Sequence, residues 1–244
     1  MYGLMGIQLR QGKLGGKVVQ KFGFNPAIST DEETVWDDGG LYGYISTATT
    51  LKVSSSSAND DSAGTGARTV EIFGLDDNWN EVSETITMDG QTAVTTTETY
   101  MRVHRAVVRT AGTGETNAGD IYVGDGAVSS GVPATKYLKM TAGEGQTLMA
   151  LWTVPAGYTL YLFNATIGTG STASNKYLES RLKVRPFGEV FQTKVVVTQA
   201  NGMYKHEFDA PLTVPEKSDV EWRAHTSSGT DAVTAMFHGI YLPA

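Results

Sequence analysis

The residues best suited to chemistry are oxygen ligands in a turn between two expected strands. Asp76, Asn78 and Asn80 stand at alternate positions, as in the opening of a calcium-binding loop. That loop has a glycine at its sixth position for a sharp turn and a bidentate glutamate at its twelfth, where this chain has Glu81 and Thr87. The pattern therefore predicts a solvated hairpin turn, in which Asp and Asn side chains bind their own backbone, and no metal site.

Other arrangements that could support catalysis or hold a cofactor are incomplete. No two of the four histidines have the spacing of a zinc motif, and no serine lies in a nucleophile elbow. The glycine-rich stretch Gly168–Ala173 is not followed by the helix that a dinucleotide pyrophosphate requires. Adjacent carboxylates fall in expected turns, and a glycosidase would need two of them to face each other across a cleft. We expect no catalytic, cofactor-binding or metal-binding residues, and no enzyme activity.

Two sets of basic residues are the candidates for partner binding. They are Lys13, Lys17 and Lys21 near the N-terminus, and Arg181, Lys183 and Arg185 further on. The second set alternates along an expected strand, so its side chains share one face over roughly 13 Å. Such a row is typical of a solvated face with ion pairs, and it would equally suit an acidic partner surface. We take all six as candidate partner-binding residues.

The elements that would position these residues are mostly strands. Residues 178–185 alternate apolar and polar, which predicts a strand with one wet face, and residues 220–225 do the same. Asp89-Gly90 and Asn201-Gly202 are turn signals between strands. The more apolar faces of the C-terminal strands predict a shared core, formed by Leu160, Leu162, Leu182, Val184, Val220 and Trp222.

The composition agrees with an all-β chain and excludes several classes of function. The 244 residues include 28 glycines and only 18% charged residues, which favours many turns and little helix. A net charge of −7 argues against direct nucleic-acid binding, because a phosphate-backbone binder needs a basic face. The chain has no cysteine, which fits assembly in a reducing cytoplasm. No apolar run is long enough for a transmembrane helix, so no membrane association is expected.

Three segments carry a resemblance to a known family. Residues 64–108 read GTGARTVEIFGLDDNWNEVSETITMDGQTAVTTTETYMRVHRAVV, Lys21–Gly40 reads KFGFNPAISTDEETVWDDGG, and Gln146–Leu162 reads QTLMALWTVPAGYTLYL. They resemble a group of tailed-phage virion structural proteins, found in podovirus-like and marine phages, and together they span about half the chain. The resemblance implies that this chain is part of a virion, more firmly than it implies which part.

These observations predict three regions in an all-β fold. An extended N-terminal arm covers residues 1–38, with a short strand at Lys17–Phe22 and a helical turn near Asp31–Val35. A β-rich domain with a hairpin ribbon covers residues 39–135, and a β-sandwich of the jelly-roll type covers residues 136–244. The two sandwich-like halves would join near Asp125–Lys136.

The function that we predict is non-enzymatic and structural. The chain would be a capsid decoration, cement or head-fibre protein, assembled in the host cytoplasm and bound to the virion surface as a homo-oligomer, with a trimer among the forms considered. Its partners would be the major capsid protein or other virion proteins. The alternative is a neck or tail subunit or a carbohydrate-binding module for host attachment, and a glycan hydrolase is the weakest hypothesis. Exposed aromatics would serve sugar binding, with Tyr42, Tyr44, Trp79, Tyr122 and Tyr158 as candidates.

Overall fold

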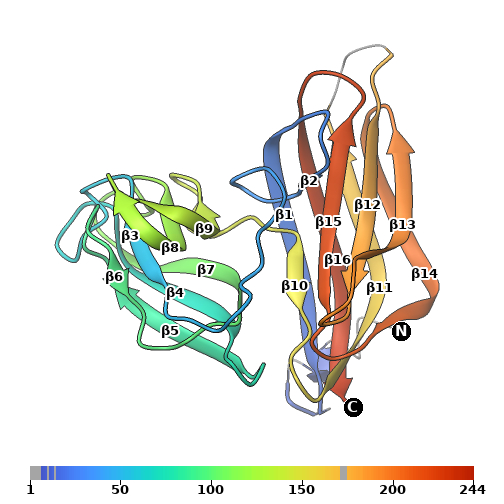
Figure 1. Cartoon of the computed structure of the whole chain (residues 1–244), viewed down its shortest axis with the longest axis horizontal. Helices are drawn as coiled ribbons and strands as arrows, with labels where there is room; N and C mark the ends of the chain where they lie inside the picture. Colours follow the sequence, from blue (N-terminus) through green and yellow to red (C-terminus); the bar gives the residue numbers. More distant parts are fainter. Residues whose placement is uncertain (1–6, 10, 14, 171–174) are drawn as a thin grey trace. The chain divides into compact units, whose positions relative to one another are not determined.

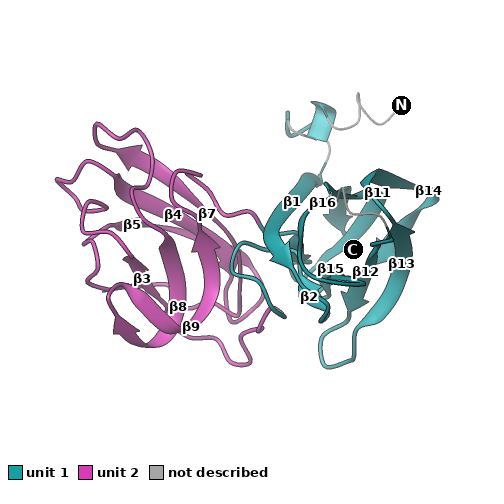
Figure 2. Ribbon diagram, turned by 90° about the horizontal axis from the view of Figure 1, so that it is seen from above, with its two compact units in different colours: residues 1–41, 149–244 teal, residues 42–148 magenta. Residues whose placement is uncertain are grey.

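The computed structural model describes residues 7–9, 11–13, 15–170 and 175–244, which form two compact all-β units (Figure 1). Unit 1 combines Met1–Leu41 with Met149–Ala244, and unit 2 is Tyr42–Leu148 (Figure 2). Unit 2 is thus an insertion within unit 1. The two connecting segments leave unit 1 from adjacent positions, because Trp36 and Met149 form an antiparallel bridge. Closely spaced chain ends are what a domain insertion requires.

Unit 1 is a sandwich of two antiparallel sheets. Sheet A has the order β1 (Lys17–Ile28), β16 (Asp231–Pro243), β11 (Tyr158–Thr169) and β14 (Gly202–Val214). Sheet B has the order β10 (Leu151–Thr153), β15 (Asp219–Thr226), β12 (Leu178–Arg185) and β13 (Gln192–Gln199), with β2 (Glu33–Thr34) also paired to β15. Apart from β2, the described part of unit 1 has eight strands, and they form nested pairs. The outermost pair in sequence is β1 with β16, followed by β10 with β15, β11 with β14 and β12 with β13. A long hairpin rolled into two layers in this way is a jelly roll.

From Lys17 onward the predicted N-terminal arm is instead part of this sandwich, while residues 1–6, 10 and 14 of the arm lie outside the described residues. The short strand expected at Lys17–Phe22 extends to Ile28 and pairs with β16 along its length. Gly23 explains the close docking, because a Cβ there would lie 2.2 Å from the Ala150 nitrogen and 2.5 Å from the Val35 oxygen. The apolar residues of this segment fall on both faces without a steady period, and this irregular pattern concealed the strand.

The helical turn expected near Asp31–Val35 is also absent, and β2 takes its place. The Glu33 carboxylate accepts the backbone N–H of Ser29 at 2.9 Å and that of Gly40 at 2.8 Å. Burial alone would raise the pKa of Glu33, but these bonds outweigh it, so the pKa is lowered. The Ser29–Glu33 spacing resembles a helix cap, yet here it closes a loop.

Unit 2 consists of two smaller antiparallel sheets. One has the order β6 (Val94–Thr95), β3 (Lys52–Ser55), β8 (Ile121–Ser129) and β9 (Val132–Met140). The other has the order β5 (Glu81–Thr87), β4 (Ala67–Leu75) and β7 (Arg102–Ala111). The boundary expected after residue 135 falls inside β9, and the expected link Asp125–Lys136 belongs to the β8–β9 hairpin. The glycine-rich composition of this segment suggests a linker. The glycines instead serve the hairpin, in which Gly126 and Gly131 adopt positive φ.

The predicted core of the C-terminal strands is confirmed. Leu160, Leu162, Leu182, Val184, Val220 and Trp222 all belong to one buried apolar cluster of unit 1. Trp222 is fully buried, and its indole N–H donates to the Met236 carbonyl at 3.2 Å. Val19 and Ile28 of β1 join the same cluster, so the N-terminal strand contributes to the core as well as to the sheet.

Candidate interaction surfaces

The arginine–lysine row predicted on residues 181–185 lies on the outward face of β12, beside the outward residues of β15. The register forms three cross-strand pairs: Arg185 with Asp219, Lys183 with Glu221, and Arg181 with Arg223. We call these six residues the charge ladder. The first two pairs join opposite charges, as in the Arg185–Asp219 ion pair at 2.6 Å. The third places two cations opposite each other, which is unfavourable without a counter-ion.

Glu32 supplies that counter-ion from the loop before β2. Its carboxylate lies 3.6 Å from the Arg181 guanidinium and 3.2 Å from that of Arg223, and accepts from the Lys183 ammonium at 2.7 Å. Burial would raise the pKa of Glu32, but the bonds from Lys183 and Arg223 outweigh it, so the pKa is lowered. Burial likewise works against the charge of Arg223, yet Glu221 and Glu32 raise its pKa on balance.

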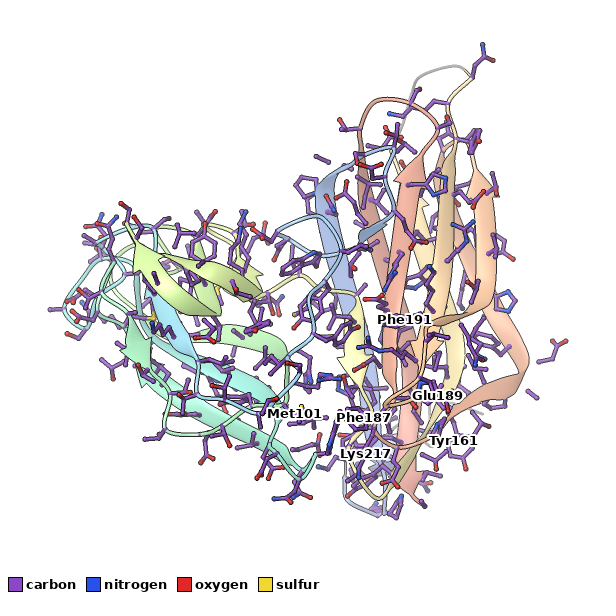
Figure 3. The ribbon with its side chains drawn as sticks, in the orientation of Figure 1. Met101, Tyr161, Phe187, Glu189, Phe191 and Lys217 are labelled. Carbon is purple, nitrogen blue, oxygen red and sulfur yellow. The ribbon has the colours of Figure 1, made fainter. Side chains whose placement is uncertain are left out.

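Phe191 completes this surface at the end of the loop between β12 and β13 (Figure 3). The guanidinium carbons of Arg185 and Arg223 each lie 4.5 Å from the centre of its ring, within range of cation–π attraction. The lysine and arginine side chains of the charge ladder therefore interact with carboxylates and an aromatic ring of the same chain. This supports the explanation as an ion-paired face, and a role in binding an acidic partner stays a prediction.

The N-terminal lysines do not extend the ladder. Lys13 and Lys17 are exposed, and the Lys17 ammonium lies 6.0 Å from the centre of the Tyr241 ring. Lys21 is only 8% exposed, because it shares the side of β1 that carries the core residue Val19. Since β1 belongs to sheet A and the ladder to sheet B, the two predicted sets do not form a single basic surface.

The candidate calcium turn in unit 2 is a hairpin turn, as predicted. One Asp76 carboxylate oxygen accepts the backbone N–H groups of Asn78 at 2.9 Å and of Asn80 at 2.8 Å. Among the residues that the structure describes, no group of three or more His, Cys, Asp or Glu side chains is placed to hold a metal ion. Trp79 adopts a φ of 65°, which lets the turn direct its indole inward.

The prediction of exposed aromatics for sugar binding is wrong for three of the five residues. Tyr42, Trp79 and Tyr122 are at most 7% exposed. The Arg102 guanidinium lies 4.8 Å from the centre of the Trp79 ring and 5.1 Å from that of Tyr44, within range of cation–π attraction. Arg102 is itself buried and donates a hydrogen bond to the Ile45 carbonyl at 2.7 Å. The Trp79 and Tyr44 rings thus contact a guanidinium inside unit 2 and help to stabilise this unit.

Sequence reasoning missed the residue that organises the loops of unit 2. Asp60 is fully buried, and its carboxylate accepts the backbone N–H groups of Ala67, Ala118 and Gly119 at 2.7–2.9 Å. It also accepts the Ser55 hydroxyl at 2.6 Å. Four donors from three segments thus meet at one side chain. The loop around Asp60 is rich in Ser, Asp and Gly, which is the composition of a solvated turn. Only the contacts with residues distant in the sequence show that Asp60 is buried and holds the loops together.

A shallow apolar hollow opens on the outward face of sheet A. Its lining is mainly apolar, and it encloses about 400 Å³ between Phe24, Gly168, Thr169, Gly170, Gly202, Met203, Ala232 and Thr234. Phe24, Thr234, Gly168 and Met203 form one row across the four strands, and the glycine leaves the floor without a side chain. The Thr169 hydroxyl is buried and has no hydrogen-bond partner among the described atoms. The hollow is large enough for a small apolar group.

Comparisons with known proteins give no family. No family model and no curated protein matches the chain. Solved structures of infectious bursal disease virus show a weak likeness: the Gt strain structure has 9% identity and a TM-score of 0.22, covering 94% of this chain and 73% of that chain. The structure of the VP2 subviral particle of the same virus has 8% sequence identity and a TM-score of 0.21. It covers 93% of this chain and 71% of that chain. A likeness at this level establishes neither a common fold nor a common function. In the described residues, no helix has the length and hydropathy needed to cross a membrane.

Proposed function

We propose that this chain is a non-enzymatic structural protein of a phage virion, held on the particle as a homo-oligomer. The observation that carries the proposal is the jelly roll of unit 1, a fold that recurs in viral capsid proteins, although also in lectins and cupins. Fold alone does not decide function. The three segments that resemble tailed-phage virion proteins favour the first of these uses.

A purely structural role agrees with how the buried carboxylates are used. Asp60 binds backbone donors, and Asp219 binds the Arg185 guanidinium and the Thr153 hydroxyl. Groups that are committed to internal bonds stabilise a fold and are poorly placed for proton transfer. We accordingly propose that the chain turns over no substrate.

At finer detail we propose a capsid decoration, cement or head-fibre protein that contacts the major capsid protein. A neck or tail subunit is the alternative within the same class. A carbohydrate-binding module is less favoured, because Tyr42, Trp79 and Tyr122 are buried and cannot form a stacking platform.

Immunogold labelling of gradient-purified particles tests the proposal. Antibodies against the folded chain should label intact particles of the phage that encodes it, and should not label particles of an unrelated phage. Label spread over the head supports decoration, whereas a single label at the head–tail junction supports the neck. Antigen that sediments only with unassembled protein contradicts a virion role.

A further inference from the structure

Strand β13 is an open edge of the jelly roll. It is the outermost strand of sheet B and pairs only with β12, and no strand of the described chain pairs with its other edge. Its backbone therefore presents a row of hydrogen-bonding groups along one side. Proteins usually protect such an edge with lysine, proline, a bulge or a short strand, because an open edge pairs readily with another strand.

The other edges of the sandwich carry these protections. In β14 the register jumps between residues 207 and 212, so a bulge that contains Pro211 interrupts the strand. Strand β10 is only three residues long. In β1 a register shift coincides with Pro26, and the Gly23 backbone is closely covered by residues 35 and 150. Strands β1 and β14 also have proline-free paired runs, at Lys17–Asn25 and Gly202–Glu207, but both contain lysine, whereas the run from Val195 to Gln199 of β13 carries no charge.

The composition of β13 favours pairing. Its sequence QTKVVVTQ is rich in β-branched residues, and its only charge, Lys194, is the residue that the register with β12 skips. Val195 and Val197 face the core and are at most 7% exposed, whereas Val196 points outward and is 56% exposed. An exposed valine within an open run that carries no charge, Val195 to Gln199, is a feature that a covered edge would explain.

The sequence is also nearly symmetric about Val196. Valines flank it on both sides, at positions 195 and 197. In an antiparallel pair of two β13 strands centred on Val196, Val195 of one copy would lie opposite Val197 of the second copy. Lys194 would lie opposite Thr198, a neutral partner, so no like charges would meet. Because this register preserves the inward and outward faces, the two β-sheets would continue as one.

We propose that β13 pairs antiparallel with β13 of a second copy, about a two-fold axis through Val196. The contact is isologous, with the same residues contributed by both copies. The inference rests on the proposed homo-oligomer and specifies one of its contacts. Because the chain has no cysteine, the axis can be tested with one introduced thiol.

The test is oxidation of the full-length Val196→Cys chain under mild conditions. Directly opposed residues of an antiparallel pair have Cα atoms roughly 4.5–5.5 Å apart, within the range of about 4.4–6.8 Å that a disulfide spans. Most of the chain should become a disulfide-linked dimer. The matched control is Met203→Cys, at a 70% exposed residue of β14, which should remain largely monomeric. Equal cross-linking of both variants, or none at position 196, overturns the proposal.

A second variant measures the contact without cross-linking. In Val196→Lys two ammonium groups would meet on the axis, so the dissociation constant seen by analytical ultracentrifugation should rise at least about tenfold. Met203→Lys should leave it unchanged, and both should keep the wild-type circular dichroism spectrum. A wild-type chain that stays monomeric at its highest soluble concentration, or that loses self-association through Met203→Lys alone, contradicts the proposal. Dimers that form through β13 but never occur in particles would refute the virion role and leave this contact intact.

Discussion

The two units differ in how far apart in the sequence their paired strands lie. In unit 1 the first strand pairs with the last, so that Lys17 lies opposite Tyr241. In unit 2, β4–β5 and β8–β9 are hairpins of consecutive strands, while β3–β6, β3–β8 and β4–β7 join non-consecutive strands. Local pairs form with a small loop-closure cost, whereas the jelly roll needs both ends of the chain and must accommodate an inserted unit. An insertion is tolerated because it lengthens one connection and leaves the nested pairing intact.

The units also differ in where they place charge. Unit 1 has twelve Lys and Arg against thirteen Asp and Glu, while unit 2 has seven against thirteen, so unit 2 carries most of the net charge of −7. The near balance of unit 1 agrees with the charge ladder, in which cations and carboxylates pair on the sheet surface. Unit 2 instead buries single polar side chains, such as Asp60 and Asn117, that hold its loops.

The largest effect is expected in the core of unit 1. Trp222→Ala removes a fully buried indole and should lower the free energy of unfolding of unit 1 by about 3–5 kcal/mol. Chemical denaturation monitored by circular dichroism measures this loss. Val190→Ala, at a 77% exposed residue outside the proposed β13 contact, is the control and should change little. An unfolding midpoint that does not respond to Trp222→Ala would remove this residue from the core.

Unit 2 should be most sensitive at Asp60. Asp60→Ala leaves three backbone N–H groups and one hydroxyl without their acceptor, and we expect a loss of about 3 kcal/mol in the free energy of unfolding. Asp77→Ala, at an exposed carboxylate of the Asp76 turn, should change stability far less. Hydrogen exchange would locate the effect, with faster exchange at Ala67, Ala118 and Gly119. Similar losses for both variants would contradict the role of Asp60.

The position of β1 predicts an intermediate effect. Gly23→Ala places a methyl group against the backbone of residues 35 and 150, so it should destabilise unit 1 by about 1–3 kcal/mol. Gly15→Ala is the control, because a Cβ there meets no atom within 4 Å. If residues 17–28 behaved as an arm that leaves the sandwich, the two variants would have equal thermal midpoints.

The smallest effect is expected at Glu32. Its lowered pKa means that it stabilises the fold above its unfolded pKa of about 4.5, and that this contribution is lost as the pH falls through the lower folded value. Glu32→Gln should cost at most about 1 kcal/mol at pH 7, because the carboxylate is 29% exposed and screened by water. The difference from wild type should vanish at low pH. A difference that is the same at pH 7 and pH 2 would show that the ion pairs do not cause it.

Local patterns predicted the strands but not all of their partners. Alternation along residues 178–185 and 220–225 identified the core around Trp222. Alternate side chains of a strand point to the same side of the sheet, so the apolar ones can pack together in one core. The Asp76 turn was also predictable, because Asp and Asn bind their own backbone within a few residues. Both features depend on interactions that are close in the sequence.

The remaining features depend on contacts between distant residues. The apolar residues of strand β1 follow no steady period, and the strand is fixed by pairing with β16, more than two hundred residues away. Arg181, Lys183 and Arg185 formed a visible row, but their partner Glu32 could not be identified from spacing. On β7, Arg102, Val103 and His104 are all buried, because tertiary packing overrides simple alternation.

The central claim is that this chain is a structural component of a virion. Quantitative mass spectrometry of gradient-purified particles tests it most directly, with isotope-labelled peptides of this chain and of the major capsid protein as standards. A homo-oligomeric surface protein should be present in a fixed, multiple copy number per particle that does not change between preparations or after a salt wash. Trace amounts that vary between preparations and fall on washing would contradict the claim.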